Sequence, residues 1–262
     1  MMLKDKVAVI YGAGGAIGSA VARAFAAEGA SLFLTGRHLA PVNVAAKDVV
    51  SAHGSAEAAE VDALDEQAVD DHLQSVIDKA GRVDISFNAV GIPNPKQRPQ
   101  LVDLDVDQFL LPIETYARSN FLTARLAARR MVPNRSGVIM TVTATTSRTG
   151  VPLVGGAGPA MAAMEALTRG LSAELAPHGL RVVGLRTPGL PDTARIKEVF
   201  RLSATALGLT SEQFHTTIAS RTHTRRLTTL EELTNVAVFT ASDRASAMTG
   251  TVVNLSMGSL DD

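Results

Sequence analysis

Short apolar runs alternate along the chain with stretches that repeat apolar side chains every three or four residues. The apolar runs predict β-strands over residues 7–10, 30–37, 56–65, 83–91 and 137–143. The stretches between them predict amphipathic helices over residues 19–29, 39–53, 68–80, 113–131 and 159–175. Strands that alternate with helices predict an α/β fold, a doubly wound parallel sheet with helices on both faces.

The first predicted strand ends abruptly in a glycine-rich turn, directly before the first predicted helix. The residues of this turn are Gly12, Gly14, Gly15, Ala16, Ile17 and Gly18. Glycines at such a corner let the backbone approach a ligand, and the positive end of the helix dipole favours a phosphate there. A pyrophosphate is therefore the first candidate ligand. The alternative, that the corner needs glycine for steric reasons only, stays open.

The second predicted strand ends in Gly36 and Arg37. In dinucleotide-binding folds an acidic side chain at this place binds the ribose hydroxyls, whereas an arginine accommodates a 2′-phosphate. Arg37 therefore favours NADP(H) over NAD(H) as the cofactor. A solvated surface arginine is the alternative.

The amino-acid composition argues against several classes of function. The formal net charge is −1 and no basic tail or stripe is present, which argues against a nucleic-acid partner. The chain has no cysteine, which excludes disulfides and thiolate chemistry, and no histidine pair with carboxylates has metal-ligand spacing. The charged start leads directly into the first strand, and no apolar stretch approaches the roughly 20 residues that span a bilayer. We therefore expect a cytoplasmic protein without a signal peptide, membrane contact or metal.

Several motifs in order along the chain resemble the short-chain dehydrogenase/reductase family. They are the glycine turn, Asp62, the run Asn88-Ala89-Val90-Gly91, and Pro188-Gly189 followed by Thr193. The resemblance runs almost end to end, since residues 228–233 and 242–254 match the family's late helix and last strand. It implies a single Rossmann-like domain over residues 1–262, with a small helical substrate flap at about residues 190–226. The turn departs from the family pattern at Ala16, where the family has glycine, and at Tyr11, where it has threonine.

The resemblance implies a dinucleotide site that extends beyond the turn and Arg37. Its further positions are Asp62, Ala63, Asn88, Ala89, Gly91, Pro188, Gly189 and Thr193. The first two would contact the adenine, the next three would pack behind the cofactor, and the last three would meet the nicotinamide carboxamide. Simpler alternatives remain: Asp62 caps the following helix, Asn88 satisfies backbone amides in the core, and Pro188-Gly189 forms only a turn.

One catalytic position of the family is matched at Asn120, within the predicted helix 113–131. By resemblance, this asparagine lies at a helix kink and holds a water of a proton relay. In the alternative it faces solvent or a partner helix. Family members pair through the helices that here carry Asn120 and Met161, so we expect a homo-oligomer, either a dimer or a tetramer.

The proton-transfer groups of the family are missing. In the family a serine polarises the carbonyl, and a tyrosine four residues before a lysine supplies the proton. Residues 162–182 match the family without a gap, which places these three positions at Ala144, Ala157 and Met161. No small shift restores them, because the two tyrosines are Tyr11 and Tyr116 and residues 97–196 contain no lysine. Removing a positioned acid typically costs ~10²–10⁴ in rate.

The loop before the helix 159–175 is glycine-rich, and Pro159 suits a first helical position. We therefore predict that the helix begins at Pro159 and that Ala157 lies in the preceding loop. Polar side chains remain nearby, either as an ordinary polar loop or to orient a carbonyl or bind an anion. They are Thr143, Thr145, Thr146, Ser147 and Arg148.

Two further segments frame the predicted site. Residues 92–112 are rich in proline and polar side chains and predict a flexible rim. The predicted flap is expected to be anchored by Phe200, Leu202, Leu207, Leu209 and Phe214. His215 and His223 also fall there, either as surface residues or as a replacement proton donor.

Two functions follow from these features. The first is an NADP(H)-dependent oxidoreductase that acts on a small carbonyl or alcohol by a non-standard proton route. The second is a catalytically silent dinucleotide-binding protein that acts as a sensor or as a structural subunit.

Overall fold

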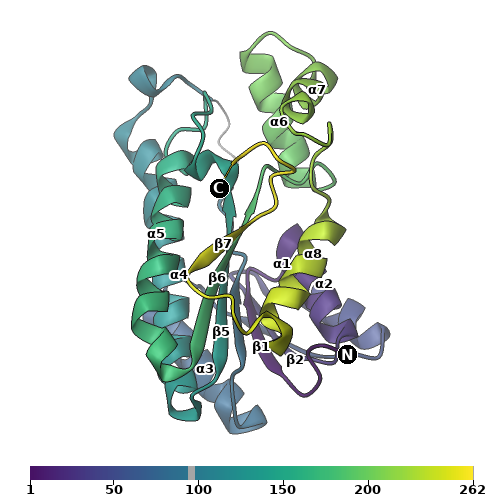
Figure 1. Ribbon diagram of the computed structural model, residues 1–262, viewed down its shortest axis with the longest axis vertical. Helices are drawn as coiled ribbons and strands as arrows, with labels where there is room; N and C mark the ends of the chain where they lie inside the picture. Colours follow the sequence, from purple (N-terminus) through teal and green to yellow (C-terminus); the bar gives the residue numbers. More distant parts are fainter. Residues whose placement is uncertain (94–97, 262) are drawn as a thin grey trace.

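The computed structural model, which describes residues 1–93 and 98–261, is built on one parallel β-sheet (Figure 1). Its strands are β1 (Val7–Tyr11), β2 (Ser31–Gly36), β3 (Ser55–Glu60), β4 (Ile85–Asn88), β5 (Gly137–Ala144), β6 (Leu180–Thr187) and β7 (Thr251–Asn254). They lie in the order β3-β2-β1-β4-β5-β6-β7, and all neighbouring pairs are parallel. The doubly wound parallel sheet is thus confirmed, although β6 is not among the strands predicted from the apolar pattern.

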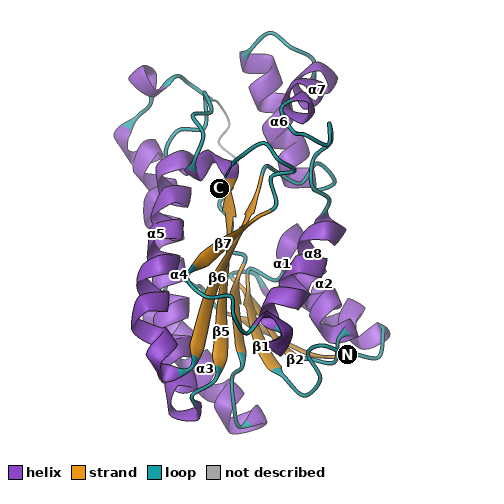
Figure 2. Ribbon diagram, in the orientation of Figure 1, coloured by secondary structure: helices purple, strands orange, loops and turns teal. Residues whose placement is uncertain are grey.

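Helices cover both faces of this sheet (Figure 2). They are α1 (Ala16–Ala27), α2 (Leu39–Ser51), α3 (Glu66–Ala80), α4 (Val106–Met131), α5 (Ala157–Leu175), α6 (Ala194–Ala206), α7 (Ser211–Ser220) and α8 (Leu230–Ala241). Helices α1, α2 and α8 pack on one face and α3, α4 and α5 on the other, while α6 and α7 stand beyond the carboxyl ends of the strands.

Strand β1 shows why a strand of this sheet appears in the sequence as a continuous apolar run. All of its residues are buried. Ala8 and Ile10 pack into the core beneath α1, α2 and α8, whereas Val9 and Tyr11 pack into the core beneath α3 and α4. Successive side chains of a strand point to opposite faces, so a strand covered on both sides is apolar at every position.

The chain crosses the sheet in two directions, and its switch point lies between β1 and β4. The glycine turn follows β1 at this point, where open α/β sheets bind their ligands. A Cβ on Gly12, whose φ is +73°, would lie 2.6 Å from the carbonyl oxygen of Ala89. One on Gly18 would lie 2.4 Å from the carbonyl oxygen of Gly12. Glycine is therefore sterically required at these two positions, whatever the turn binds.

Helix α4 begins earlier than the sequence pattern indicated, so the predicted start at residue 113 is wrong. Asp105 caps the helix by accepting hydrogen bonds from backbone N–H groups of its first turn, which starts the helix at Val106. Pro112 consequently lies inside the helix, where it removes one backbone hydrogen bond. The predicted flexible rim over 92–112 is wrong in its second half, which holds a 3₁₀ turn and the start of α4; residues 94–97 lie outside the described residues.

Helix α5 also begins earlier than predicted. Its first residue is Ala157, not Pro159, so the placement of Ala157 in a loop is wrong. Pro159 is the third helical residue, where it is tolerated because the first N–H groups of a helix have no intrahelical acceptor. Gly156 precedes the helix and packs closely against α4, since a Cβ there would lie 1.9 Å from the carbonyl oxygen of Phe109.

Helices α6 and α7 occupy the segment predicted as a helical flap. Phe200 and Phe214 are buried, and their rings meet edge to face at 5.4 Å between centroids, so these two anchors are confirmed. Leu207 and Leu209 are 46% and 37% exposed, so the prediction that they are anchors is wrong. They lie in the link between the two helices, outside the small core that Phe200 and Phe214 form. Leu202 is half-buried.

The close packing of α5 against α4 predicts opposite effects for two glycine substitutions in the same region. Gly156→Ala should lower the free energy of unfolding by about 1–3 kcal/mol, because its methyl group would overlap α4. Gly170→Ala, in the exposed part of α5, should raise it by up to about 1 kcal/mol, because a Cβ there would meet no described atom within 4 Å apart from the neighbouring backbone of its own helix. Urea unfolding followed by circular dichroism measures both. An unchanged stability of Gly156→Ala would contradict the packing described.

Candidate functional site

The turn after β1 exposes backbone at the start of α1. Gly14, Gly15 and Ala16 are exposed, and Ile17 is half-buried. Gly15 stands at the N-cap of α1 and has no side chain with which to accept hydrogen bonds from the first-turn N–H groups. These donors, at the positive end of the helix dipole, are available to an anion.

Arg37 lies exposed at the end of β2, beside this turn. Gly36 is in register with Glu60 of β3, and the Glu60 carboxylate accepts a hydrogen bond of 3.1 Å from the backbone N–H of Leu39. The site near Arg37 therefore holds one negative charge as well as one positive charge. The sequence analysis did not include Glu60 among the candidate site residues, although the position of this carboxylate at the end of the third strand could have indicated it.

Asp62 and Ala63 lie directly after β3. An Asp62 carboxylate oxygen accepts a 3.0 Å hydrogen bond from the backbone N–H of Leu64, and Asp65 rather than Asp62 caps α3. The capping alternative for Asp62 is therefore wrong. Ala63 is buried and packs into the core beneath α3 and α4.

Asn88 ends β4 with both polar atoms of its side chain engaged. Its Oδ1 accepts a 2.9 Å hydrogen bond from the backbone N–H of Val90, and its Nδ2 donates to Thr123 Oγ1 at 3.0 Å. Asn88 thus satisfies backbone in the core, as the simpler alternative expects. Ala89 is half-buried, and Gly91 is exposed with a guanidinium nitrogen of Arg195 close above it.

The segment after β6 leads into α6. Gly189 has a φ of +124°, a conformation that glycine adopts without strain, and Pro188 is half-buried. Thr193 is buried and caps α6, since its Oγ1 accepts from the backbone N–H of Ile196 at 3.3 Å and donates to the carbonyl oxygen of Leu190 at 2.8 Å. The Thr193 hydroxyl is consequently committed to the helix cap.

Thr187, the last residue of β6, is a hydroxyl that sequence reasoning missed. It is in register with Ala144, its side chain is buried, and its Oγ1 has no hydrogen-bond partner among the described residues. An unpaired buried hydroxyl is uncommon, and here it lies at the carboxyl edge of the sheet, where a ligand atom can supply the partner.

Asn120 is buried and ties α4 to the sheet, so the alternative that it faces solvent is wrong. Its Oδ1 accepts a 2.8 Å hydrogen bond from Thr141 Oγ1 of β5, and its Nδ2 donates to the carbonyl oxygen of Tyr116 at 3.0 Å. Helix α4 continues without interruption through this position.

The side chains at Ala144, Ala157 and Met161 can neither donate nor accept a proton. Ala144 ends β5, and the other two lie in the first turns of α5, with Met161 buried. Tyr11 is no substitute, because its fully buried hydroxyl has no partner among the described residues and burial raises its pKa well above the usual value. Tyr116 Oη accepts a 3.4 Å hydrogen bond from Arg195 Nη2.

The histidines of the flap differ in their surroundings. His215 is half-buried with its ring 6.0 Å from that of Phe200, and His223 is exposed. The described contacts of His215 are with Phe200 of the flap and those of His223 are with the segment at Gly258, so the structure gives no geometric support to either as a replacement proton donor.

A buried ion pair joins α5 to β6 at the end of the sheet where the glycine turn lies. Arg186 Nε lies 2.7 Å from Glu165 Oε1, Arg186 Nη2 lies 2.9 Å from Glu165 Oε2, and both side chains are 3% exposed. Ser147 Oγ donates to the same Oε1 at 2.6 Å, and Thr143 Oγ1 donates to it at 3.2 Å. Sequence reasoning considered these two hydroxyls but missed Glu165 and Arg186, because α5 and β6 carry other charged residues as well, Arg169 and Glu174 in α5 and Arg181 in β6.

This arrangement decides the charge of Glu165. Burial alone would raise the pKa of the carboxyl, but the hydrogen bonds from Arg186 and Ser147 and the charge of Arg186 outweigh it, so the pKa lies below its usual value. Glu165 is therefore a carboxylate at neutral pH, and a carboxylate held in this way is a poor proton donor.

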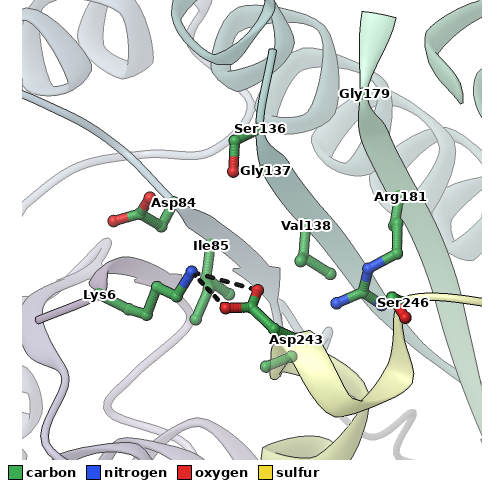
Figure 3. Close-up of a pocket in the computed structure, with 11 residues that line it drawn as sticks. Lys6, Asp84, Ile85, Ser136, Gly137, Val138, Gly179, Arg181, Asp243 and Ser246 are labelled. Carbon is green, nitrogen blue, oxygen red and sulfur yellow. Dashed lines mark hydrogen bonds and ion pairs between the residues drawn. The ribbon is translucent and has the colours of Figure 1, made fainter. Parts of the chain in front are cut away.

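A cavity of about 230 Å³ lies at the opposite, amino-terminal edge of the strands (Figure 3). Its charged groups are already engaged: Lys6 pairs with Asp243, Asp84 accepts from the backbone N–H of Val7, and Arg181 donates to the carbonyl oxygens of Thr240 and Ser242. We do not assign the candidate site to this cavity, because open parallel sheets bind ligands at their carboxyl edge.

Residues 1–93 and 98–261 contain neither a cluster of metal-ligating side chains nor a helix that could span a membrane. No group of three or more histidine, cysteine, aspartate or glutamate side chains in this part of the chain could hold a metal ion. None of its helices combines the length and the apolar character that a membrane span requires.

The sequence matches known proteins over its full length. Residues 12–259 match the sequence model of a family described as enoyl-(acyl carrier protein) reductase. The chain is 28% identical over 262 residues to 7alpha-hydroxysteroid dehydrogenase of Escherichia coli, covering 100% of this chain and 97% of that protein. It is 27% identical over 251 residues to gluconate 5-dehydrogenase of Gluconobacter oxydans, covering 96% and 93%.

Solved structures share the fold. A short-chain type dehydrogenase/reductase from Mycobacterium marinum superimposes with a TM-score of 0.83 at 26% identity, covering 98% of this chain and 96% of that one. Sorbitol-6-phosphate 2-dehydrogenase from Erwinia amylovora superimposes with a TM-score of 0.90 at 24% identity, covering 97% and 100%. The second likeness shows the fold alone.

The buried ion pair predicts that its single and double variants differ sharply. Glu165→Leu or Arg186→Leu alone should lower the free energy of unfolding by about 3–5 kcal/mol, because each leaves a buried charge uncompensated. The double variant Glu165→Leu/Arg186→Leu should recover most of that loss, since apolar pairs of similar volume often replace buried ion pairs without cost. Chemical unfolding of the three variants measures this, and a double variant as unstable as the sum of the singles would contradict it.

The same pair predicts a dependence on pH. A carboxyl whose pKa is lower in the folded than in the unfolded state stabilises the fold above its unfolded value, here 4.5, and loses this contribution as the pH falls through the folded value. Wild type should therefore lose stability below about pH 4.5 more steeply than Glu165→Leu/Arg186→Leu. Unfolding curves measured between neutral and acid pH test this, and parallel curves for the two proteins would contradict it.

Proposed function

The chain belongs to the short-chain dehydrogenase/reductase family, and on that premise we propose that it binds NADP(H) at the glycine turn and acts as an oxidoreductase on a small carbonyl or alcohol. The observation that carries the proposal is the exposed turn of Gly14, Gly15 and Ala16, in which the N-cap residue Gly15 offers no side chain to the first-turn N–H groups of α1, while the N–H of Gly15 itself donates to the carbonyl oxygen of Gly12 at 3.0 Å. These residues fit a pyrophosphate, which needs close approach of backbone and free donors at a helix N-terminus. The bound dinucleotide would supply hydride transfer.

Other residues at the carboxyl edge support the same proposal. Asp62 and Ala63 flank the adenine side in this proposal, and Asn88, Ala89 and Gly91 form the wall behind the dinucleotide. Pro188 and Gly189 lie on the nicotinamide side in this proposal, where the hydroxyl of Thr187, which has no hydrogen-bond partner among the described residues, can bond to the carboxamide. Thr193 keeps a supporting role there, because its hydroxyl already caps α6.

The proposed proton route does not use the serine, tyrosine and lysine of the family, whose positions we assign to Ala144, Ala157 and Met161. Asn120 is proposed to hold a water of the relay through its backbone or its side chain, which is already hydrogen-bonded to Thr141. The curated relatives named above act on a hydroxysteroid and on gluconate, which supports a hydroxyl-bearing or carbonyl-bearing substrate. We assign α6 and α7 as the flap over this substrate and treat residues 1–262 as one domain.

One observation favours the second candidate, a catalytically silent dinucleotide-binding protein. At the three positions that we assign to the family's serine, tyrosine and lysine, this chain has hydrocarbon or thioether side chains. Met161 is buried and contributes to the packing. Such a protein would still bind the dinucleotide. We further propose a homo-oligomer formed through α4 and α5, on whose outer surface Phe121 is 43% exposed.

Arg37 predicts the cofactor preference. Arg37→Ala should weaken NADPH binding about tenfold and leave NADH binding within about twofold, because one charge-assisted contact to the 2′-phosphate is lost. Arg23→Ala, a half-exposed arginine farther along α1 that pairs with Asp48, is the control and should change neither. Fluorescence titration with NADPH and with NADH measures the affinity of wild type, Arg37→Ala and Arg23→Ala for each cofactor. Equal losses for both cofactors in Arg37→Ala would contradict the preference.

Restoring the missing groups separates the enzyme from the silent protein. If the chain is the silent protein, the variant Ala144→Ser/Ala157→Tyr/Met161→Lys should gain NADPH-dependent carbonyl reduction, since a positioned acid usually contributes ~10²–10⁴ in rate; the proposed oxidoreductase should instead turn over as wild type and gain little from the variant. Because Met161 is buried, the thermal stability of the variant must be measured beside its activity. Turnover by wild type that the variant does not improve supports a distinct proton route. Reduction by the variant alone, with none by wild type, overturns the oxidoreductase proposal in favour of the silent protein.

A further inference from the structure

Ser147 presents a hydroxyl beside the candidate site, and the direction of its hydrogen bond is fixed. It lies in the 3₁₀ turn that follows β5, three residues after Ala144, and its side chain is half-buried. This turn packs against the start of α5: a Cβ on Gly158 would lie 3.2 Å from the carbonyl oxygen of Thr146. Ser147 thus borders the place where Ala144 and Ala157 leave no polar group.

The neighbour of this hydroxyl is a carboxylate that the fold holds in its charged form. Arg186 binds both oxygens of Glu165 in a buried bidentate pair, at 2.7 and 2.9 Å. Because Ser147 Oγ lies 2.6 Å from Glu165 Oε1 and a carboxylate can only accept, the serine must be the donor.

A serine hydroxyl has one proton and two lone pairs. With its proton committed to Glu165, Ser147 offers only lone pairs to any ligand beside it. A carbonyl oxygen, which needs a donor, gains nothing from such a group. A hydroxyl or amine, which brings its own proton, completes the hydrogen bond.

We propose that Ser147, oriented by the Glu165–Arg186 pair, is a hydrogen-bond acceptor that selects ligands carrying a hydroxyl or amine over the matching carbonyl compounds. Ser147 touches the ligand in this proposal, and Glu165 and Arg186 are positioning residues. The inference rests on the proposed dinucleotide site, since the ligand would bind beside the nicotinamide.

The first test determines, in the absence of any ligand, whether the side chain at position 147 donates its proton to Glu165. The chain contains no cysteine, so Ser147→Cys introduces a single thiol whose ionisation can be followed by its rate of alkylation against pH. A thiol that donates to a carboxylate should ionise about one pH unit or more above one that does not. The control is Thr146→Cys, which places the thiol one residue away in the same turn and keeps the ion pair. Equal or lower pKa at position 147 would overturn the proposal.

A second variant removes the carboxylate while keeping the buried charges balanced. In Ser147→Cys/Glu165→Gln/Arg186→Gln the thiol pKa should fall by about one unit or more relative to Ser147→Cys. An unchanged pKa would show that Glu165 does not hold the proton. Circular dichroism shows whether this triple variant folds. If it does not, the proposal is tested by the difference in thiol pKa between Ser147→Cys and Thr146→Cys.

The second test measures whether the protein binds an alcohol in preference to the matching ketone. Saturation-transfer NMR on the NADP(H)-loaded protein compares cyclohexanol with cyclohexanone as matched probes. Wild type should favour the alcohol, Ser147→Ala should lose that preference, and Thr146→Val should keep it. Preference for the ketone, equal binding of the two or binding of neither overturns the proposal. Failure to bind NADPH itself would instead refute the proposed function, and the thiol measurements on the cofactor-free protein would still stand.

Discussion

The close approach of two backbone segments at the switch point of the sheet is the constraint on which the site depends. The turn after β1 and the loop after β4 come so near that a Cβ on Gly12 would overlap the carbonyl oxygen of Ala89. This contact brings the exposed start of α1, Arg37 and the end of β4 to one edge of the sheet. Gly12 and Gly18 are the glycines that the packing constrains most tightly, but the exposed residues Gly14 and Gly15 are constrained as well: a Cβ on Gly14 would lie 2.9 Å from Cβ of Pro41, and one on Gly15 would lie 3.3 Å from the carbonyl oxygen of Gly12. Sterics therefore constrain all four glycines of the motif, and the approach of a ligand to the exposed backbone of Gly14 and Gly15 is what the proposed function adds.

The order of strands and helices from β1 to α5 was predictable from the apolar pattern, because strands buried on both faces and helices with one apolar face carry strong periodic signals, whereas β6 was not predicted. Element boundaries were less predictable. Asp105 starts α4 well before its apolar repeat becomes clear, and Pro159 suited a first helical position but is tolerated at the third. Leu207 and Leu209 failed as anchors because an apolar residue near a helix end is buried only when another element covers it.

The site was predictable only where a single local motif carries it, as in the glycine turn. Glu165 and Arg186 lie 21 residues apart on different elements, and nothing in either segment indicates that the two side chains meet. Their pairing makes Glu165 a fixed carboxylate and thereby converts Ser147 and Thr143 from free hydroxyls into donors to the protein itself. Two hydroxyls near Ala144, those of Thr143 and Ser147, which could have been supposed to replace the serine that the resemblance places there, are thus engaged in holding α5 to β5 and β6. The chain combines the proposed dinucleotide-binding turn with a hydrogen-bond network, built on Glu165 and Arg186, where the family resemblance places proton transfer.

The central claim is that the glycine turn binds a phosphorylated dinucleotide although the usual proton donors are missing. The most direct measurement is the thermal unfolding midpoint of wild-type protein in increasing NADPH, since a ligand that binds only the folded state raises the midpoint by mass action. The midpoint should rise steadily with NADPH and rise less with the same concentrations of NADH. A midpoint that stays constant in both cofactors would contradict the claim.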